Sequence, residues 1–306
     1  MEINICLASD DNYAKFTGVH IKSVAEMAST GNLYNVYILD GGITEINKTK
    51  LLKLETELCK IHFVDMKAMV KDLNLESLHV SGHISLATYY RLFLPNIFTN
   101  IDKILYVDCD TVFMKDPAEI YSIDLENYLL GAVRDIGLLN DRNRGKWDSK
   151  YFEKNIALND FDDYFNAGVI LYNLKAMREY DKNILEIMQS IKKPKFHDQC
   201  YLNKFAAGKV KYLPFIWNYW GGFKIENPDY KNTFPKKYLN ELEEAAKAPG
   251  IIHAKPWNNP DNEWSEAFFE YARKTPFYET ILYPTIKKKT VRKIKKFLFF
   301  KIKYRV

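Results

Sequence analysis

The sequence predicts an α/β domain in which helices flank a mainly parallel sheet. Short apolar runs of strand length alternate with longer segments whose apolar residues recur every three or four positions. Several apolar runs end in residues that favour turns, as at Asp40-Gly41-Gly42. This order of strands and helices is typical of a parallel sheet with crossover helices.

In the first part of the chain, three apolar runs predict strands and the two segments between them predict helices. The expected strands are 3–8, 33–39 and 61–64, and the expected helices are 13–28 and 44–59. The apolar residues that share one side of the first helix are Phe16, Val19, Val24 and Met27. Thr44 is the expected N-cap of the second helix, because a threonine hydroxyl accepts a hydrogen bond from the first turn.

The second part continues the same alternation. Strands are expected at 104–107, 129–133 and 167–171, and helices at 174–191 and 198–206. Residues 211–264 are rich in Trp, Tyr, Pro and Asn and have poor periodicity, so we interpret them as loops and short elements of the same domain. A break in composition near Pro284 divides a main domain, residues 1–284, from a basic tail, residues 285–306.

The composition is that of an ordinary globular protein, with 47% hydrophobic and 27% charged residues among 306. The net charge is +5, but residues 287–306 hold ten Lys or Arg and no acidic residue. The rest of the chain is therefore mildly acidic, which disfavours a general nucleic-acid-binding surface. The four cysteines are scattered, which disfavours a disulfide framework or a zinc cluster and favours a reducing compartment. The first residues lack the pattern of a signal peptide, and apolar runs stay short of the roughly 18 residues of a spanning helix.

Acidic side chains follow three of the expected strands. Asp10 and Asp11 follow the first strand, Asp108 and Asp110 the fourth, and Asp135 the fifth. Ligands of open α/β sheets bind beyond the carboxyl ends of the strands, so we expect these carboxylates to meet at one edge. Any single Asp in such a place is equally explained as a turn or cap residue.

The triplet Asp108-Cys109-Asp110 differs because it comes directly after a hydrophobic strand. Residues two apart in an extended segment face the same side, so both carboxylates are expected to point together while Cys109 points away. Two converging carboxylates form half of a site for a hard cation. Such a cation can bridge the phosphates of a nucleotide-activated substrate and neutralise charge on the departing diphosphate.

His253 and Lys255 are the next candidates. An imidazole suits several divalent metals, although a lone histidine is more often structural. Lys255 is suited to place a point charge on a phosphate, with a solvated surface lysine as the alternative. The motifs GxxxxGK[ST], GxSxG and HExxH are missing, and no GxGxxG follows the first strand. A dinucleotide-binding Rossmann domain is therefore disfavoured.

Six ordered blocks carry a resemblance to a known family. They are LASDDNY (7–13), HISLATYYRLFLP (83–95), KILYVDCDTVFMKD (103–116), YFNAGVILYNL (164–174), HDQCYLN (197–203) and IIHAKPW (251–257). From residue 3 to about residue 264 the chain resembles glycosyltransferase family 8, the retaining group that includes bacterial lipooligosaccharide and lipopolysaccharide galactosyl- and glucosyltransferases. The resemblance implies a GT-A fold, a Rossmann-like, mainly parallel mixed sheet flanked by helices.

By this resemblance, each matching position takes a role in a UDP-hexose site. The positions that match the uracil and ribose segment are Ala8, Asp10 and Asn12. The positions that match the metal ligands are Asp108, Asp110 and His253, with Mn²⁺ as the family metal and Mg²⁺ as a second choice. Lys255 matches the lysine that contacts the diphosphate. The positions that match the donor-sugar pocket are Arg91, Asp135, Asn166, Ala167, Asp198 and Gln199. The catalytic candidates among them are Gln199, Asp198 and Asp135, and Gln199 matches the side chain beneath the anomeric carbon. The positions near the donor and acceptor are His83 and Thr88.

The sequence departs from the family pattern at three places. The segment between the ligand histidine and the following KPW triplet is contracted to His253-Ala254-Lys255. His197 has no assigned role beyond starting a helix. Residues 136–160 match no family segment and are expected to form a loop on the acceptor side.

The resemblance implies an enzyme that transfers galactose or glucose from a UDP-sugar to a saccharide of a cell-surface glycan such as lipopolysaccharide. Because Gln199 is a poor nucleophile, we favour front-face transfer, assisted by the diphosphate, over a double displacement. Two alternatives stay open at this point. One is an inactive sugar-nucleotide or glycan-binding protein on the same scaffold, and the other is a nucleotidyltransferase with a similar metal site.

The composition of the basic tail predicts where in the cell the protein lies. The apolar residues that recur there at helical spacing are Val291, Ile294, Leu298 and Ile302, with Phe297, Phe299 and Phe300 beside them. A basic amphipathic helix with aromatic residues suits an anionic membrane surface. The alternatives are a helix docked on the enzyme body and a nucleic-acid tail, which the acidic body disfavours. We therefore expect a cytoplasmic enzyme held peripherally at the inner face of the membrane, where a glycolipid acceptor lies.

Overall fold

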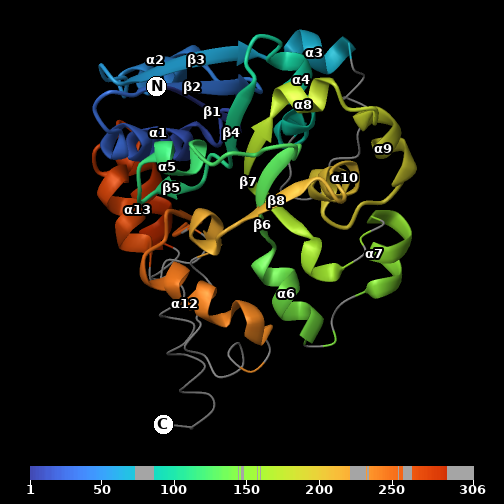
Figure 1. Cartoon of the computed structure of the whole chain (residues 1–306). Helices are drawn as coiled ribbons and strands as arrows, with labels where there is room; N and C mark the ends of the chain where they lie inside the picture. The colour runs from blue at the N-terminus through green and yellow to red at the C-terminus, as the bar shows by residue number, and fades with distance from the viewer. Residues whose placement is uncertain are drawn as a thin grey trace, which may run out of the picture.

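A seven-stranded sheet forms the centre of the molecule, with the strand order β3-β2-β1-β4-β7-β6-β8 (Figure 1). The computed structural model describes residues 1–72, 86–143, 145, 148–156, 158, 160–220, 232, 234–253, 255–257 and 264–287. The strands of this sheet are β1 (Glu2–Ser9), β2 (Leu33–Asp40), β3 (Cys59–Asp65), β4 (Lys103–Val107), β6 (Leu130–Arg134), β7 (Phe165–Asn173) and β8 (Val210–Leu213). The expected α/β class is thus confirmed.

The direction of β7 decides which residues reach the functional edge. Strands β1, β2, β3 and β4 pair in parallel, as do β6 and β8, whereas β7 is antiparallel to both β4 and β6. The carboxyl ends of β1, β4 and β6 therefore share one edge of the sheet, and the amino end of β7 lies at the same edge. Asn166 and Ala167 arrive at this edge because β7 runs against its neighbours.

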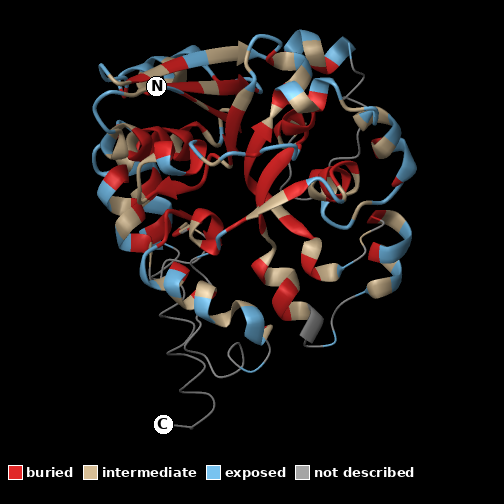
Figure 2. Ribbon diagram, in the orientation of Figure 1, coloured by how far each residue is buried: buried red, intermediate tan, exposed pale blue. Residues whose placement is uncertain are grey.

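The sheet is buried on both faces (Figure 2). In β1, Ile3, Ile5 and Leu7 pack into one apolar core, while Cys6 and Ala8 pack into a second core on the opposite face. Helices α1 (Ala14–Met27), α5 (Pro117–Tyr121), α12 (Leu239–Lys247) and α13 (Ser265–Ala272) cover the first core. Elements η2 (Leu86–Phe93), α4 (Leu94–Ile97), α8 (Leu174–Arg178), α9 (Ile184–Ser190) and α10 (His197–Phe205) cover the second. Successive residues pack into opposite cores because side chains alternate between the two faces of a strand.

Two of the expected helices are shorter than predicted. Helix α2 covers only Glu45–Leu52, with Thr44 as its cap, and Cys59 begins β3 instead of ending the helix. The prediction of one helix over 174–191 was also wrong, because α8 ends at Arg178 and α9 starts at Ile184. The Asn183 side chain accepts a hydrogen bond from the Leu185 backbone N–H at 2.9 Å and so starts a new helix.

The segment 136–160, expected as a loop, contains helices, and the segment 211–264 contains short elements as expected. Residues 136–160 include α6 (Ile136–Asn143) and α7 (Ser149–Ile156). Within 211–264, the strands β9 (Tyr219–Trp220) and β10 (Ile251–His253) form a small sheet with β5 (Val112–Phe113) in the order β5-β10-β9. This sheet brings the strand that ends in His253 beside the segment that follows Asp110, across more than 130 positions of sequence. The other short elements are α3 (Lys67–Asp72), η3 (Phe161–Asp163), η4 (Phe215–Asn218) and η5 (Lys236–Tyr238).

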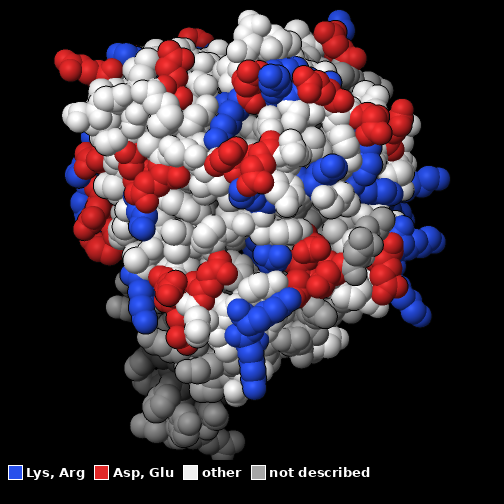
Figure 3. Space-filling model, viewed as in Figure 1, with Lys and Arg blue, Asp and Glu red and all other residues white. Residues whose placement is uncertain are grey.

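The face in Figure 3 carries acidic and basic side chains interspersed, in keeping with the near balance of charge outside the tail. His83, Ala254 and residues 288–306 of the basic tail lie outside the described residues. Residues 278–287 are helical, and Thr285 within them is buried. Among the helices that the structure describes, none has the length and apolar character needed to cross a membrane.

Candidate active site

The expected site residues gather at the carboxyl edge of the sheet, around a cavity of about 380 Å³. The predicted residues that line it are Ala8, Asp10, Arg91, Asp108, Asp110, Asn166, Ala167, Asp198, Gln199 and Lys255. An adjoining cavity of about 290 Å³ is lined by Asp135 and His253, and it shares Asp108, Asn166 and Lys255 with the first. The two cavities therefore meet at the carboxylate that ends β4.

The carboxylates of Asp108 and Asp110 are held by a turn that closes at Thr111. The Thr111 backbone N–H and hydroxyl both donate to the Asp108 carbonyl, at 3.1 and 2.9 Å. The Asp108 N–H donates in turn to the Gly168 carbonyl at 2.8 Å, which ties the turn to β7. Cys109 is buried in the apolar core, so the expectation that it points away from the two carboxylates is confirmed.

Helix α1 supports this turn through the side chain of His20. The Nδ1 atom of His20 lies 3.1 Å from both the carbonyl and the hydroxyl oxygen of Thr111. Since the Thr111 hydroxyl donates its own proton to Asp108, Nδ1 of His20 carries the hydrogen. Burial lowers the pKa of His20 to about 4, so its ring is neutral at neutral pH.

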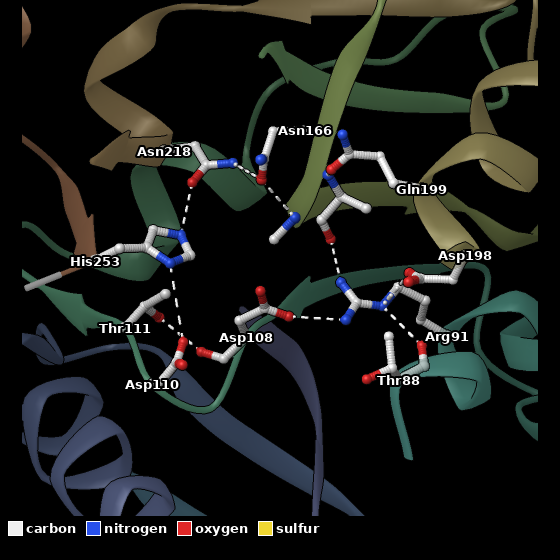
Figure 4. Close-up of polar contacts among 12 residues, drawn as sticks. Thr88, Arg91, Asp108, Asp110, Thr111, Asn166, Asp198, Gln199, Asn218 and His253 are labelled. Atoms are coloured by element: carbon white, nitrogen blue, oxygen red, sulfur yellow. Dashed lines mark hydrogen bonds and ion pairs between the residues drawn. The ribbon is translucent and has the colours of Figure 1, made fainter. Parts of the chain in front are cut away.

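Asp108, Asp110 and His253 place three potential ligand atoms within 4.8 Å of one another. Oδ1 of Asp110 is buried, has no hydrogen-bond partner among the described residues, and faces Nδ1 of His253 at 3.9 Å (Figure 4). Burial and the nearby Lys255 charge lower the pKa of His253, so its imidazole is neutral. Burial opposes the ionisation of Asp110, but the charge and the hydrogen bond of Lys255 oppose this effect, and the pKa of Asp110 lies below its ordinary value. Two carboxylates and a neutral imidazole are a suitable donor set for a divalent cation such as Mn²⁺.

Lys255 lies against the same carboxylate. Its Nζ atom is 2.9 Å from Oδ2 of Asp110, and this carboxylate raises the pKa of Lys255. The backbone of Lys255 has φ of 44°, in the left-handed region that residues with a side chain rarely adopt. The chain therefore turns at Lys255, whose side chain lines both cavities.

Arg91 joins the two sides of the cavity. Its Nη2 lies 3.0 Å from Oδ1 of Asp108 and its Nε lies 3.0 Å from Oδ2 of Asp198. Nη1 donates to the carbonyl of Ala167, and the guanidinium lies over the ring of Tyr106 at 4.4 Å. Burial raises the pKa of Asp198 to about 6, although the Arg91 charge opposes this shift. The two acids and the arginine thus form one charge cluster, in which Arg91 and Asp198 are buried and Asp108 is partly exposed.

Gln199 is oriented by a backbone group and a carboxylate. Its Oε1 accepts the Ala167 N–H at 2.9 Å, and its Nε2 donates to Oδ2 of Asp135 at 3.0 Å. Asn166 donates to the same oxygen at 3.1 Å, while Oδ1 of Asp135 accepts the Leu138 N–H at the start of α6. Asp135 therefore accepts three hydrogen bonds, and its position after β6 fixes both amide side chains.

Three residues at or after the end of β1 are expected to bind the nucleoside, and two of them line the cavity. Ala8 and Asp10 line it, and Asp10 accepts the Tyr13 N–H at 3.0 Å as α1 begins. Asn12 is exposed and lines neither cavity. Thr88 lines the first cavity, as expected, and so does His197, which also starts α10 as predicted.

Several residues of the site carried no signal in the sequence. Asn218 bonds to His253 and Asn166, and Trp220 lines the second cavity with its side chain exposed. Both come from the segment without periodicity, and an isolated Asn or Trp there fits a loop equally well. Gly168 is within the matched block 164–174, but only the packing explains it. A Cβ there would lie 2.9 Å from Cε1 of His253 and 3.0 Å from Oδ2 of Asp108.

Comparisons with known proteins bear on the family and on the fold. Residues 4–261 match the model of "Glycosyl transferase family 8". A Haemophilus influenzae protein described as a glycosyltransferase is 33% identical over 226 residues, which are 71% of this chain and 63% of that relative. The lipopolysaccharide 1,2-glucosyltransferase of Escherichia coli is 24% identical over 263 residues, 84% of this chain and 73% of the relative. The crystal structure of the galactosyltransferase LgtC with donor and acceptor sugar analogues superposes with a TM-score of 0.71 and 26% identity, covering 90% of this chain and 96% of LgtC.

Proposed function

The chain belongs to glycosyl transferase family 8, and from this premise we propose that it transfers a hexose, galactose or glucose, from a UDP-sugar to a saccharide acceptor with retention of anomeric configuration. One observation carries the proposal. A donor set for a divalent cation, the ammonium of Lys255 and the amide of Gln199 line two adjoining cavities at the carboxyl edge of the sheet. This is the combination that transfer from a diphosphate-activated sugar requires.

The residues around Asp108 suit the diphosphate end of the donor. Asp108, Asp110 and His253 would hold Mn²⁺, which neutralises charge on a departing diphosphate when it is bound. Lys255 adds a cation at the same place and has Asp110 as its partner in the absence of donor. The nucleoside is expected beside Ala8 and Asp10, at the end of β1.

The sugar end of the cavity favours front-face transfer. A double displacement needs a carboxylate that can approach the anomeric carbon. Asp198 is paired with Arg91, and Asp135 accepts three hydrogen bonds, so both carboxylates are engaged in holding neighbours. Gln199 is neutral and is held at both ends of its amide. We therefore assign Gln199 to stabilising the developing positive charge with its carbonyl oxygen, and Asp135 and Asp198 to orienting the donor.

The second cavity suits the acceptor. It adjoins the first at Asp108, and the exposed ring of Trp220 offers an apolar surface to a sugar face. The similarity to a lipopolysaccharide glucosyltransferase makes a lipopolysaccharide or a related cell-surface glycan the proposed acceptor. We place the enzyme in the cytoplasm, at the inner face of the membrane, with its basic tail at 285–306 as the contact.

A donor screen tests the proposed function. We expect one UDP-hexose to release UDP in the presence of Mn²⁺, and a nucleotidyltransferase would release pyrophosphate instead. Asp110→Asn removes a charge from the metal site and should reduce turnover by at least about a hundredfold, while Asp102→Asn at an exposed position serves as the control. An α-linked product from an α-linked donor, identified by NMR of the anomeric proton of the transferred sugar, is the expected stereochemistry. A β-linked product, or turnover that survives Asp110→Asn, contradicts the proposal.

A further inference from the structure

Asn218 is buried between His253 of the cation site and Asn166 of the donor-sugar pocket. It ends η4, and its Oδ1 lies 2.7 Å from Nε2 of His253. Its Nδ2 donates to Oδ1 of Asn166 at 3.0 Å (Figure 4). Asn218 therefore bonds at one end to a metal-type ligand and at the other to a residue of the donor-sugar pocket.

A backbone group fixes the direction of every bond in this chain. The Gly168 N–H lies 2.8 Å from the side chain of Asn166 and can only donate, so the atom of Asn166 that it meets is the oxygen. Asn218 must then present its NH₂ group to that oxygen, which leaves its own oxygen facing His253. An oxygen at 2.7 Å requires a hydrogen on Nε2 of His253.

We propose that Asn218 is a positioning residue that holds His253 in the Nε2–H tautomer and so keeps the lone pair of Nδ1 directed at the cation site. The proposal rests on the proposed function for the identity of that site. Nδ1 is the ring nitrogen that faces Oδ1 of Asp110, at 3.9 Å. Neutral imidazole binds a metal through one nitrogen only while the other carries the hydrogen, so the partner of the second nitrogen selects the ligand atom.

The same chain continues to the sugar side. Because Asn166 accepts from Gly168 and Asn218 through its oxygen, its Nδ2 is left to donate to Asp135. The Ala167 N–H fixes the amide of Gln199 in the same way, and Gln199 donates to the same Asp135 oxygen. Two consecutive backbone N–H groups of β7, those of Ala167 and Gly168, thus orient the amides of Gln199 and Asn166. Asn218 extends the hydrogen bonds of Asn166 to His253.

The tautomer itself is the first test and needs neither metal nor donor. Histidine labelled with ¹⁵N distinguishes a ring nitrogen that bears hydrogen from one that does not, and His253→Asn assigns its signals among the six histidines. In the wild-type protein without metal, we expect Nε2 of His253 to carry the hydrogen. In Asn218→Leu, we expect a mixture of tautomers. A wild-type His253 protonated at Nδ1, or an unchanged tautomer in Asn218→Leu, overturns the proposal.

Metal affinity is the second test, read from the EPR signal of unbound Mn²⁺ in the absence of donor. Asn218→Leu should weaken Mn²⁺ binding by about 10- to 100-fold, the usual effect of losing the partner of a ligating histidine. Asn218→Asp keeps an oxygen for the Nε2 hydrogen and should stay within a few-fold of wild type, while its loss of the donor to Asn166 lowers transfer. Equal loss of affinity in both variants contradicts the proposal.

Asn35→Leu is the matched control. It removes another hydrogen bond between a buried Asn oxygen and a His Nε2, that of Asn35 and His62 at 3.2 Å, in β2 and β3. It should leave Mn²⁺ affinity unchanged. Should the wild type show the expected tautomer but bind no Mn²⁺, the metal role in the proposed function fails while the orientation by Asn218 stands. A loss of Mn²⁺ affinity in Asn35→Leu equal to that in Asn218→Leu counts against a specific role.

Discussion

Arg91 places Nη2 of its guanidinium 3.0 Å from Oδ1 of Asp108, so a carboxylate of the candidate metal site is paired with a buried cation. The same guanidinium contacts Asp198 through Nε, at 3.0 Å. One arginine therefore balances two acids that come from distant parts of the chain. Removal of the arginine would therefore leave the buried Asp198 without its cation.

We expect Arg91→Met to lower the free energy of unfolding by about 3–5 kcal/mol, because it leaves Asp198 buried without a cation. The double variant Arg91→Met/Asp198→Asn should be more stable than Arg91→Met alone, since the uncompensated charge is removed. Urea denaturation measures both. Arg273→Met, at an exposed pair with Glu266, is the control and should leave the free energy of unfolding nearly unchanged. No recovery in the double variant would show that Asp198 is not the residue that needs Arg91.

Lys255→Met should tighten Mn²⁺ binding in the absence of donor by about tenfold, because it removes a competing cation that lies 2.9 Å from Oδ2 of Asp110. The same variant should lower transfer, since a cation at the diphosphate is lost. The EPR titration and a turnover assay separate the two effects. Lys48→Met is the control, because Lys48 pairs with Asp40 at 2.8 Å outside both cavities. Weaker Mn²⁺ binding in Lys255→Met would mean that the lysine supports the site in some other way.

Gly168→Ala should reduce Mn²⁺ affinity by more than about tenfold, because its Cβ would crowd His253 and Asp108. Both residues belong to the cation site, and Gly168 packs against each of them. Gly131→Ala in neighbouring β6 is the matched control. There the added Cβ meets the terminal carbons of Leu125 and Leu213, so we expect a loss of stability of about 1–3 kcal/mol with unchanged affinity. Wild-type affinity in Gly168→Ala would exclude a steric role for this glycine.

His20 predicts a pH dependence of stability. Burial lowers its pKa from 6.5 to about 4, so between these values the unfolded chain binds a proton that the folded chain does not. As pH falls from 6.5 to 4, His20 therefore lowers the free energy of unfolding by up to about 3 kcal/mol, while Asp198, whose pKa burial raises to about 6, acts in the opposite direction. His20→Asn keeps an N–H donor for Thr111 and should remove the His20 contribution from the profile. Parallel profiles of the two proteins, from urea denaturation at each pH, would contradict the assignment.

The basic tail predicts membrane binding that depends on salt. Full-length protein should co-sediment with phosphatidylglycerol vesicles at low salt and much less with phosphatidylcholine vesicles, because each cation near an anionic surface contributes up to about 1 kcal/mol. A chain that ends at Lys287 should lose at least about tenfold in binding. The truncation is placed there because the helical residues 278–287 include the buried Thr285. Equal binding of both forms would assign any membrane contact to the enzyme body.

The sequence alone was sufficient for six of the seven strands of the central sheet, all but β8, and for the core of the site. Apolar runs and helical periodicity depend on neighbouring residues, so β1, α1 and β4 are predicted to within a few positions. The spacing of Asp108 and Asp110 after a strand likewise implies two carboxylates that converge. The family blocks supplied His253 and Lys255, which the local pattern by itself did not distinguish from structural residues.

Tertiary structure alone decided the direction of β7, the small sheet that carries His253, and the role of Asn218. These features depend on contacts between residues far apart in sequence, and no local period encodes them. A strand reads the same whether it pairs in parallel or antiparallel, so the arrival of Asn166 at the functional edge could not be read from the sequence. The hydrogen-bond direction from Gly168 through Asn166 and Asn218 to His253 exists only once three separate segments pack together, because each bond sets the orientation of the next.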